Sequence, residues 1–149
     1  MLCAAGLAFA LVAIGSRQAG GRPEIKGPRA ALNDSAATEW KVPPSADKVK
    51  NPVPSDADSV AAGKKTYEGN CTVCHGKTGK GDGPAAAYLK TRPSDLTDSK
   101  MWDRTDGNLY YKITEGRNSM PSYRLMLTDK QRWEVVNYIR TLAPKPAAK

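Results

Sequence analysis

Two cysteines and the one histidine of the chain stand together in the segment Cys71-Thr72-Val73-Cys74-His75. This spacing is compatible with four kinds of chemistry. A thioredoxin-like redox pair lies where a strand meets a helix, and no strand pattern precedes Cys71. A disulfide between residues so close would constrain almost no chain, and a zinc site would need further ligands. The fourth is covalent haem attachment, in which both thiols add to porphyrin vinyl groups and the histidine binds iron.

The composition excludes several other kinds of site. One histidine in 149 residues excludes an HExxH zinc site and a haem held by two histidines of this chain, and a haem peroxidase would lack its distal histidine. Three cysteines exclude a four-cysteine zinc cluster. Lys and Arg total 23 against 15 Asp and Glu, a net charge of +8, which favours an acidic partner. Because the basic residues are dispersed and not interleaved with aromatic residues, no nucleic-acid binding is expected.

The first fifteen residues carry no charged side chain and resemble the apolar part of an export signal. A helix of this length would span roughly 22 Å, less than the ~30 Å hydrocarbon core of a bilayer. Residues 1–15 are therefore expected to be either a cleaved export signal or a retained N-terminal anchor, and Cys3 leaves a lipid anchor open. Either alternative predicts a location in the periplasm or on the outer face of the cytoplasmic membrane.

The remaining chain divides by composition. Residues 16–54 hold six Pro, three Gly and a single aromatic residue, without helical or strand periodicity. Such a segment buries too little apolar area to offset its chain entropy, so we expect a Pro-rich, poorly ordered linker. Residues 55–143 carry helical patterns and form the expected domain, and residues 144–149 form a tail.

Helix signals recur through the expected domain and no segment alternates as a strand would, so the predicted fold class is all-α. Ser55 is a candidate N-cap with Asp58 at the third helical position, and Thr128 with Gln131 forms a capping box before the last helix. The expected helices cover residues 55–69, 85–89, 106–116 and 129–143.

Five segments of the domain carry a family pattern: Ala62 to Tyr67, Cys71 to Gly76, Gly81 to Pro84, Gly116 to Pro121 and Trp133 to Ile139. Together they resemble the class I, mono-haem c-type cytochromes with His/Met ligation, and the resemblance covers residues 55–143. It implies a cytochrome c fold, a small helical domain wrapped around one covalently attached haem c. In that family the first and last helices cross at a small residue. Gly63 is the match, facing Trp133 or Tyr138.

The resemblance also implies roles for single residues. His75 corresponds to the proximal iron ligand, whose second ring nitrogen needs a hydrogen-bond acceptor. In the family a proline carbonyl accepts, and Pro84 is similar in position, although it is also suited simply to open a helix. Arg92 is our first candidate for binding a haem propionate, with a solvated surface residue as the alternative.

Three methionines besides Met1 are candidates for the second iron ligand. Met101 stands among helix-cap residues, where a core position is expected, and Met126 precedes the last helix, where packing at the helix entrance is expected. Met120 follows the helix-stopping Gly116 in a loop and precedes Pro121. The family pattern has Met-Pro at this point, so His75 and Met120 are the expected metal ligands.

The resulting hypothesis is an exported c-type cytochrome that carries single electrons in a respiratory chain. It is not an enzyme, and its redox partners are expected to present acidic docking surfaces. The alternative is a tethered mono-haem subunit of a larger membrane quinol-oxidising or oxidase complex. The Pro-rich segment favours this alternative, as do similarities in residues 106–123 and at Arg132-Trp133.

Overall fold

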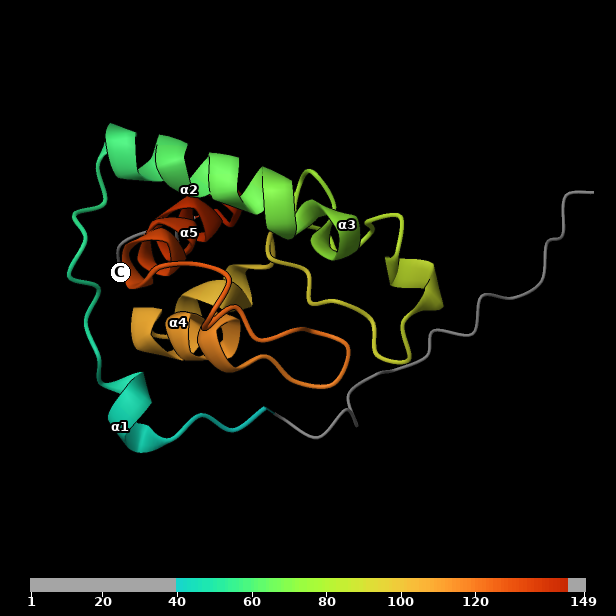
Figure 1. Ribbon diagram of the computed structural model, residues 1–149, viewed down its shortest axis with the longest axis horizontal. Coiled ribbons are helices and arrows are strands. Elements are labelled where there is room, and N and C mark those ends of the chain that lie inside the picture. Colours follow the sequence, from blue (N-terminus) through green and yellow to red (C-terminus); the bar gives the residue numbers. More distant parts are fainter. Residues whose placement is uncertain (1–39, 145–149) are drawn as a thin grey trace, which may run out of the picture. The chain divides into compact units, whose positions relative to one another are not determined.

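The computed structural model describes residues 40–144, and Figure 1 shows them as a set of helices. The predictions for residues 1–39 and for the tail from residue 145 onward lie outside the described residues. Within 40–144 the β-structure is limited to one isolated bridge between Arg117 and Met120, so the predicted all-α class is confirmed. The elements are α1 (Pro44–Asp47), α2 (Ala57–Asn70), α3 (Thr72–His75), η1 (Ala86–Tyr88), η2 (Ser99–Asp103), α4 (Asp106–Glu115) and α5 (Asp129–Leu142).

The ends of the helices follow local capping chemistry. Thr128 and Gln131 form the predicted capping box of α5, and Gly116, with φ 65°, ends α4 as predicted. The start predicted for α2 is wrong by one residue. Asp56, not Ser55, is the N-cap, because its carboxylate accepts the Ser59 N–H at 2.8 Å and the Ser59 hydroxyl accepts the Asp56 N–H at 3.2 Å.

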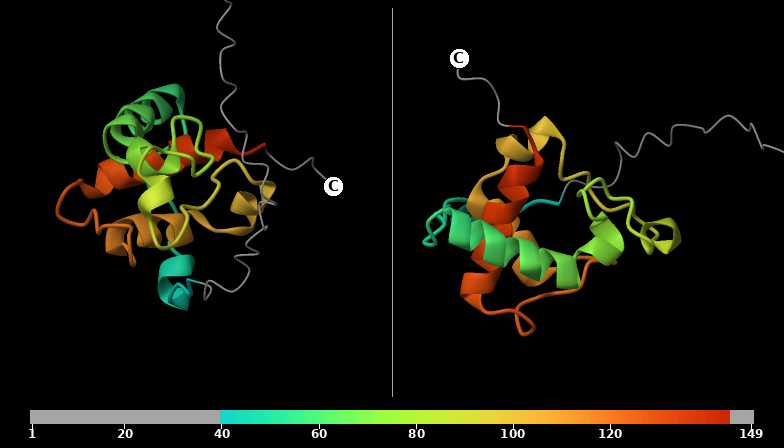
Figure 2. Two further views of the ribbon diagram at one scale, coloured as in Figure 1. Left: turned by 90° about the vertical axis from the view of Figure 1, so that its right-hand side faces the viewer. Right: turned by 90° about the horizontal axis from the view of Figure 1, so that it is seen from above.

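Helices α2 and α5 cross at a wide angle in the view from above (Figure 2) and share the most extensive helix contact among the described elements. Gly63 lies at the crossing. A Cβ atom added there would stand 1.9 Å from the Glu134 carbonyl oxygen and 3.1 Å from Tyr138 Cβ. The predicted crossing at Gly63 is confirmed, and the two backbones meet closely because Gly63 has no side chain.

Replacing Gly63 by Ala should destabilise the protein by about 2–3 kcal/mol, because the new methyl group would push two helix backbones apart. The control lies on the same helix. A Cβ at Gly69 would meet nothing within 4 Å, so Gly69→Ala should stabilise α2 by about 0.5–1 kcal/mol through backbone entropy. Urea unfolding of both variants measures the two effects, and equal unfolding midpoints would contradict the crossing.

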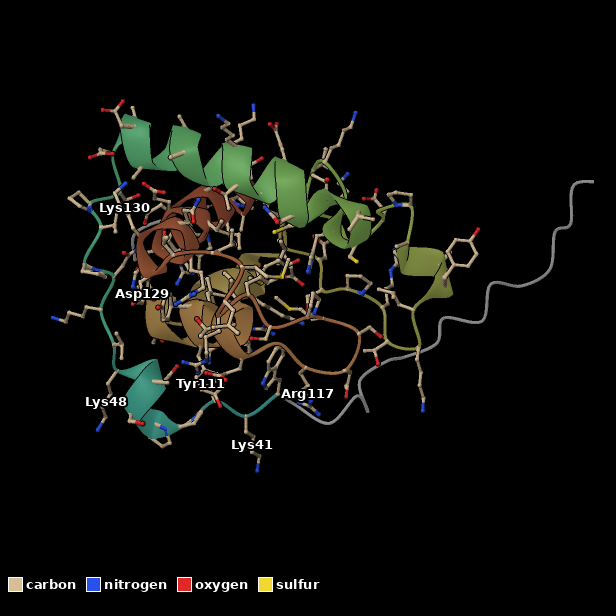
Figure 3. The ribbon with its side chains drawn as sticks, viewed as in Figure 1. Lys41, Lys48, Tyr111, Arg117, Asp129 and Lys130 are labelled. Carbon is tan, nitrogen blue, oxygen red and sulfur yellow. The ribbon has the colours of Figure 1, made fainter. Side chains whose placement is uncertain are left out.

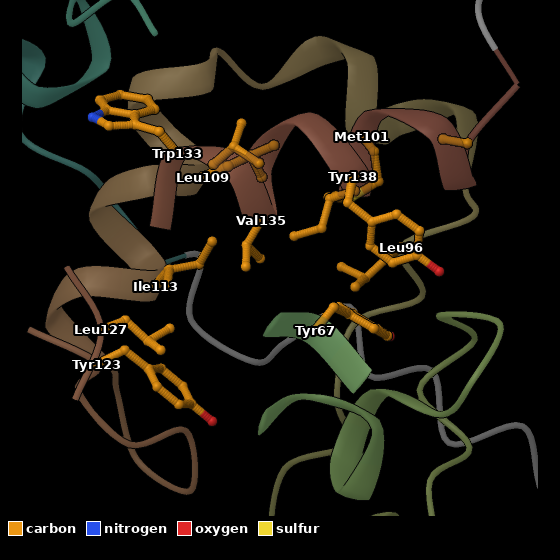
Figure 4. Packing of buried hydrophobic residues seen from close by; sticks show 13 residues of the cluster. Tyr67, Leu96, Met101, Leu109, Ile113, Tyr123, Leu127, Trp133, Val135 and Tyr138 are labelled. Atoms are coloured by element: carbon orange, nitrogen blue, oxygen red, sulfur yellow. The ribbon is translucent and has the colours of Figure 1, made fainter. Parts of the chain in front are cut away.

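Helix α5 is buried on nearly every side, with all eight residues from Arg132 to Ile139 buried. Figure 4 shows the hydrophobic ones among them, including Trp133, Val135 and Tyr138, packed with the rest of the core. Met101 is 4% exposed, as expected of a core residue. The packing predicted for Met126 is wrong: its side chain is 62% exposed, because neighbouring Leu127 instead turns into the core. The buried cluster comprises Tyr67, Leu96, Met101, Leu109, Ile113, Tyr123, Leu127, Trp133, Val135, Val136, Tyr138, Ile139 and Ala143.

Residues 40–54, which we call the strap, are ordered on the domain. This contradicts the expectation of a poorly ordered linker for this part of residues 16–54. The strap contains α1 and is joined to the domain by side-chain hydrogen bonds. Asn51 Nδ2 donates to Asn137 Oδ1 at 2.7 Å, and Asn137 Nδ2 donates to the carbonyl oxygens of Val53 and Pro54. These polar contacts compensate for the strap's low apolar content, which is why composition alone did not reveal its order.

Candidate functional site: a haem-binding motif

The two cysteines of the motif lie on one helical turn. Cys71 is the C-cap of α2, and its carbonyl oxygen accepts the N–H groups of Cys74 at 3.1 Å and His75 at 2.8 Å. Residues three apart share a helix face, so both thiols occupy the same side of the turn. Both cysteines are free and half-buried. Because a helix, and not a strand, precedes Cys71, this junction differs from that of a thioredoxin-like pair.

The loop behind the motif folds back onto it through backbone hydrogen bonds. Gly81 N–H donates to the His75 carbonyl at 2.9 Å, and Gly83 N–H donates to the Cys74 carbonyl at 3.1 Å. The Tyr67 hydroxyl donates to the Gly76 carbonyl at 2.8 Å. Gly76 and Gly81 have φ of 77° and 70°, values that a side chain would strain. The loop thus sets the direction in which His75 leaves the helix.

His75 is oriented by Ser94, which corrects the expected role of Pro84. The ring Nδ1 lies 3.2 Å from the Ser94 carbonyl oxygen, an atom that only accepts hydrogen bonds. Nδ1 therefore carries the proton, and Nε2 is left with its lone pair. Burial lowers the pKa of His75, which favours the neutral ring that binds iron. Pro84 is exposed and begins the turn leading to η1, the alternative role considered for it.

Tyr123 connects the motif with the chain that follows Met120. Its hydroxyl donates to the Asn70 carbonyl at 2.8 Å, directly before Cys71. Burial, together with the neighbouring thiols of Cys71 and Cys74, raises the pKa of Tyr123 to about 12. Burial and the Cys74 thiol likewise raise the pKa of Cys71 to about 12, so it is protonated at neutral pH. The Tyr123 hydroxyl therefore lies at the residue that directly precedes Cys71.

Met120 ends a tight turn, residues 117–120, which we call the Met120 turn. Arg117 N–H donates to the Met120 carbonyl at 2.8 Å, Met120 N–H donates to the Arg117 carbonyl at 3.0 Å, and Asn118 has φ 54°. Met120 is half-buried and packs against the core cluster. Since three residues span at most about 11 Å, Met120 is close in the chain to Tyr123, whose hydroxyl reaches Asn70 before the motif.

Arg132 holds the loop that follows the Met120 turn. Its buried guanidinium, 3% exposed, donates to the carbonyl oxygens of Tyr123, Arg124 and Leu127 and to the Tyr110 hydroxyl. It also forms an ion pair with Asp129. A charge buried so deeply is costly unless it is paired, and the contacts of the two terminal nitrogens of Arg132 hold the loop in one conformation.

The remaining predicted residue, Arg92, lies on the surface. The hydrogen bonds that Asp95 accepts from Thr97 are the main cause of the lowered pKa of Asp95, and the charge of Arg92 makes a smaller contribution. Near it in sequence, a hollow of about 360 Å³ lies between the chain after η1 and the Met120 turn. Lys90, Thr91, Asn118 and Ser119 line this hollow with hydrogen-bonding side chains.

The fold and motif agree with the comparisons with known proteins. The family model described as cytochrome c oxidase, cbb3-type, subunit III matches residues 58–139, more than half of the chain. The chain belongs to the cytochrome c family. Being a c-type cytochrome, it binds haem c with iron, and Cys71 and Cys74 provide the thiols of its CxxCH motif. It transfers electrons to and from redox partner proteins and is not an enzyme.

Individual relatives support the same family. The cytochrome is 30% identical over 86 residues to cytochrome c6 of Parathermosynechococcus lividus, covering 58% of this chain and 93% of the relative. It is 28% identical over 83 residues to cytochrome c6 of Porphyra purpurea, covering 56% and 71% respectively.

A solved structure is also similar. A chain of the Kuenenia stuttgartiensis reducing HAO-like protein complex matches with a TM-score of 0.56 and 32% identity. The match covers 62% of the cytochrome and 47% of that chain, so the cytochrome spans about half of it.

The residues of the site fit haem c. Two free thiols lie on one side of a helical turn, and a neutral imidazole presents Nε2 with its orientation fixed by Ser94. Sequence reasoning missed Ser94 and Tyr123. Pro93, which directly precedes Ser94, is the signal in the sequence that could have pointed to this segment. For Tyr123, the available signal was its position, an aromatic side chain only three residues after the candidate ligand Met120.

Proposed function

We propose that the cytochrome is an exported carrier of single electrons in which His75 and Met120 bind iron from opposite sides. The observation that most supports this proposal is the contact between the segment that follows Met120 and the segment that precedes His75. Tyr123, three residues after Met120, donates a hydrogen bond to the carbonyl oxygen of Asn70, the residue directly before Cys71. A half-buried thioether near this motif is suited to a second axial position.

Each residue of the proposed site has a defined task. The thiols of Cys71 and Cys74 would hold the haem through two thioether bonds to its vinyl groups, each thiol adding its sulfur and its hydrogen across one vinyl double bond. Haem supplies an iron that alternates between Fe(II) and Fe(III). Ser94 holds His75 in one orientation, and Arg132 holds the loop after Met120. Two persistent protein ligands leave no coordination position for oxygen or peroxide, as electron transfer requires.

Exposed cations around the motif support docking to an acidic partner. Lys77, Lys80, Lys90 and Arg92 are exposed on the chain that follows His75. With the net charge of +8, they would steer the cytochrome towards a negatively charged surface. Contacts of this kind give fast association and weaken as the salt concentration rises.

We expect the haem-containing protein to leave the membranes of the producing cells when they are washed in roughly 1 M salt, where the Debye length falls to about 3 Å. Difference absorption spectra of the wash and of the pellet measure its distribution. An integral membrane protein of the same cells serves as the control that stays in the pellet. Haem c that resists the wash and copurifies with integral proteins in detergent would contradict a free carrier.

That contrary result would support the second candidate, a tethered subunit of a membrane oxidase or quinol-oxidising complex. The family model carries the name of an oxidase subunit, and the similar Kuenenia chain comes from a protein complex. Within residues 40–144, no helix is both long and apolar enough to cross a membrane. On this candidate the tether would therefore come from residues 1–15 or from a lipid on Cys3.

A further inference from the structure

We propose that the strap holds the Met120 turn in its place, with Trp40 acting as a positioning residue for Met120. The inference rests on the proposed ligation of iron by Met120. The strap lies outside residues 58–139, the part matched by the family model, so it is an addition to the family domain. Its contacts reach both ends of α4, the helix that leads into the Met120 turn.

The middle of the strap, at α1, is attached at the beginning of α4. The Thr105 hydroxyl, at the N-cap of α4, lies 2.7 Å from the Asp47 carbonyl oxygen, and Asn108 Nδ2 donates to Asp47 Oδ1 at 3.2 Å. A Cβ on Gly107 would stand 2.2 Å from the Ala46 carbonyl oxygen, so α1 lies directly against the helix. This part of the strap is fixed by both hydrogen bonds and close packing.

The first residue of the strap, Trp40, reaches the end of α4. The half-buried Trp40 ring lies 5.7 Å from Lys112 Nζ and 5.9 Å from Arg117 Cζ, within the range of cation–π attraction. Figure 3 shows Arg117 next to this part of the strap, near Lys41. Lys112 belongs to α4, whereas Arg117 begins the Met120 turn. Trp40 therefore contacts the helix and the turn together.

Gly116 lies between these two contacts and ends the helix. With φ 65° and ψ 168° it redirects the chain from α4 into the Met120 turn, and a glycine restrains such a junction weakly. Arg117 is paired with Met120 by two backbone hydrogen bonds, so a movement of Arg117 carries Met120 with it. By attracting the cations on both sides of Gly116, Trp40 opposes the swing of the turn that would withdraw Met120.

The test compares cyanide binding to the oxidised, haem-loaded full chain in Trp40→Ala, Trp40→Phe and the unmodified protein. Cyanide reaches the iron only when the methionine leaves, so its binding rate reports how often the turn opens. We expect Trp40→Ala to bind cyanide faster, by about threefold to 25-fold, since each of two cation–π contacts contributes up to about a factor of five. Trp40→Phe, which keeps an aromatic face, should fall between the two.

Val60→Ala is the control for a general loss of stability. Val60 is half-buried on α2 and packs against the core cluster. It belongs to a different helix from α4, which leads into the Met120 turn. This variant should unfold at lower urea concentration yet bind cyanide at the unmodified rate. A Trp40→Ala rate equal to that of the unmodified protein, or raised no more than by Val60→Ala, would overturn the inference.

Met120→Ala separates this inference from the ligand proposal beneath it. If Met120→Ala keeps the far-red sulfur-to-iron(III) absorption band, the ligand proposal is wrong and the strap has no ligand to position. If Met120→Ala loses the band while Trp40→Ala binds cyanide at the unmodified rate, Met120 stands as the ligand and the role of Trp40 is refuted.

Discussion

Met120→Ala should leave the haem covalently attached but abolish the weak far-red band that a sulfur-to-iron(III) bond produces. The thioether is the second axial ligand in our proposal, and methionine with histidine raises the reduction potential of haem iron. Its loss should lower the potential by a sizeable part of the roughly 0.8 V that axial ligands span. Redox titration measures the potential, and added cyanide should bind at once because one axial position is open.

The other methionines are the matched controls for this substitution. Met101 is 4% exposed, so Met101→Ala should cost about 2–5 kcal/mol of stability and keep the band. Met126 is 62% exposed, and Met126→Ala should change stability by less than about 0.5 kcal/mol and also keep the band. Retention of the band in Met120→Ala, with its loss in either control, would show that another methionine binds iron.

Replacing both Cys71 and Cys74 by Ser should abolish covalent haem attachment. A serine hydroxyl does not add to a vinyl group under the conditions in which a thiol does, so no bond to the porphyrin would form. Acid–acetone extraction of the purified protein provides the measurement: the double variant should release its haem into the organic phase, whereas the unmodified protein should retain it. Each single variant should retain haem through the remaining thioether.

Val73→Ala is the control within the same helical turn. Val73 lies between the two cysteines and is 51% exposed, so its truncation should leave both thioethers intact. The absorption maximum of the reduced protein provides a second readout, because thioether formation removes the vinyl conjugation. Haem that stays with the double serine variant after extraction would refute attachment through Cys71 and Cys74.

Features that depend on neighbouring residues in the chain were predictable from the sequence. Thr128 with Gln131 and the stop at Gly116 act through hydrogen bonds and backbone angles within a few residues, and they appear in the structure as predicted. The same holds for the two cysteines and the histidine, whose five-residue spacing is itself the chemical signal. The choice of Asp56 over Ser55 was missed because both residues are good caps. The hydroxyl of Ser59, which completes the box, decided between them.

The sequence alone thus determined the helical class, the haem attachment motif and the glycine at which two helices cross. Only the tertiary structure decided that Ser94 accepts from His75 across 19 residues, that Met126 faces solvent, and that the strap is ordered on the domain. The physical reason is the range of the interactions. A cap is complete within one helical turn. The order of the strap instead depends on the hydrogen bond from Asn51 to Asn137, which lies 86 positions later in the chain.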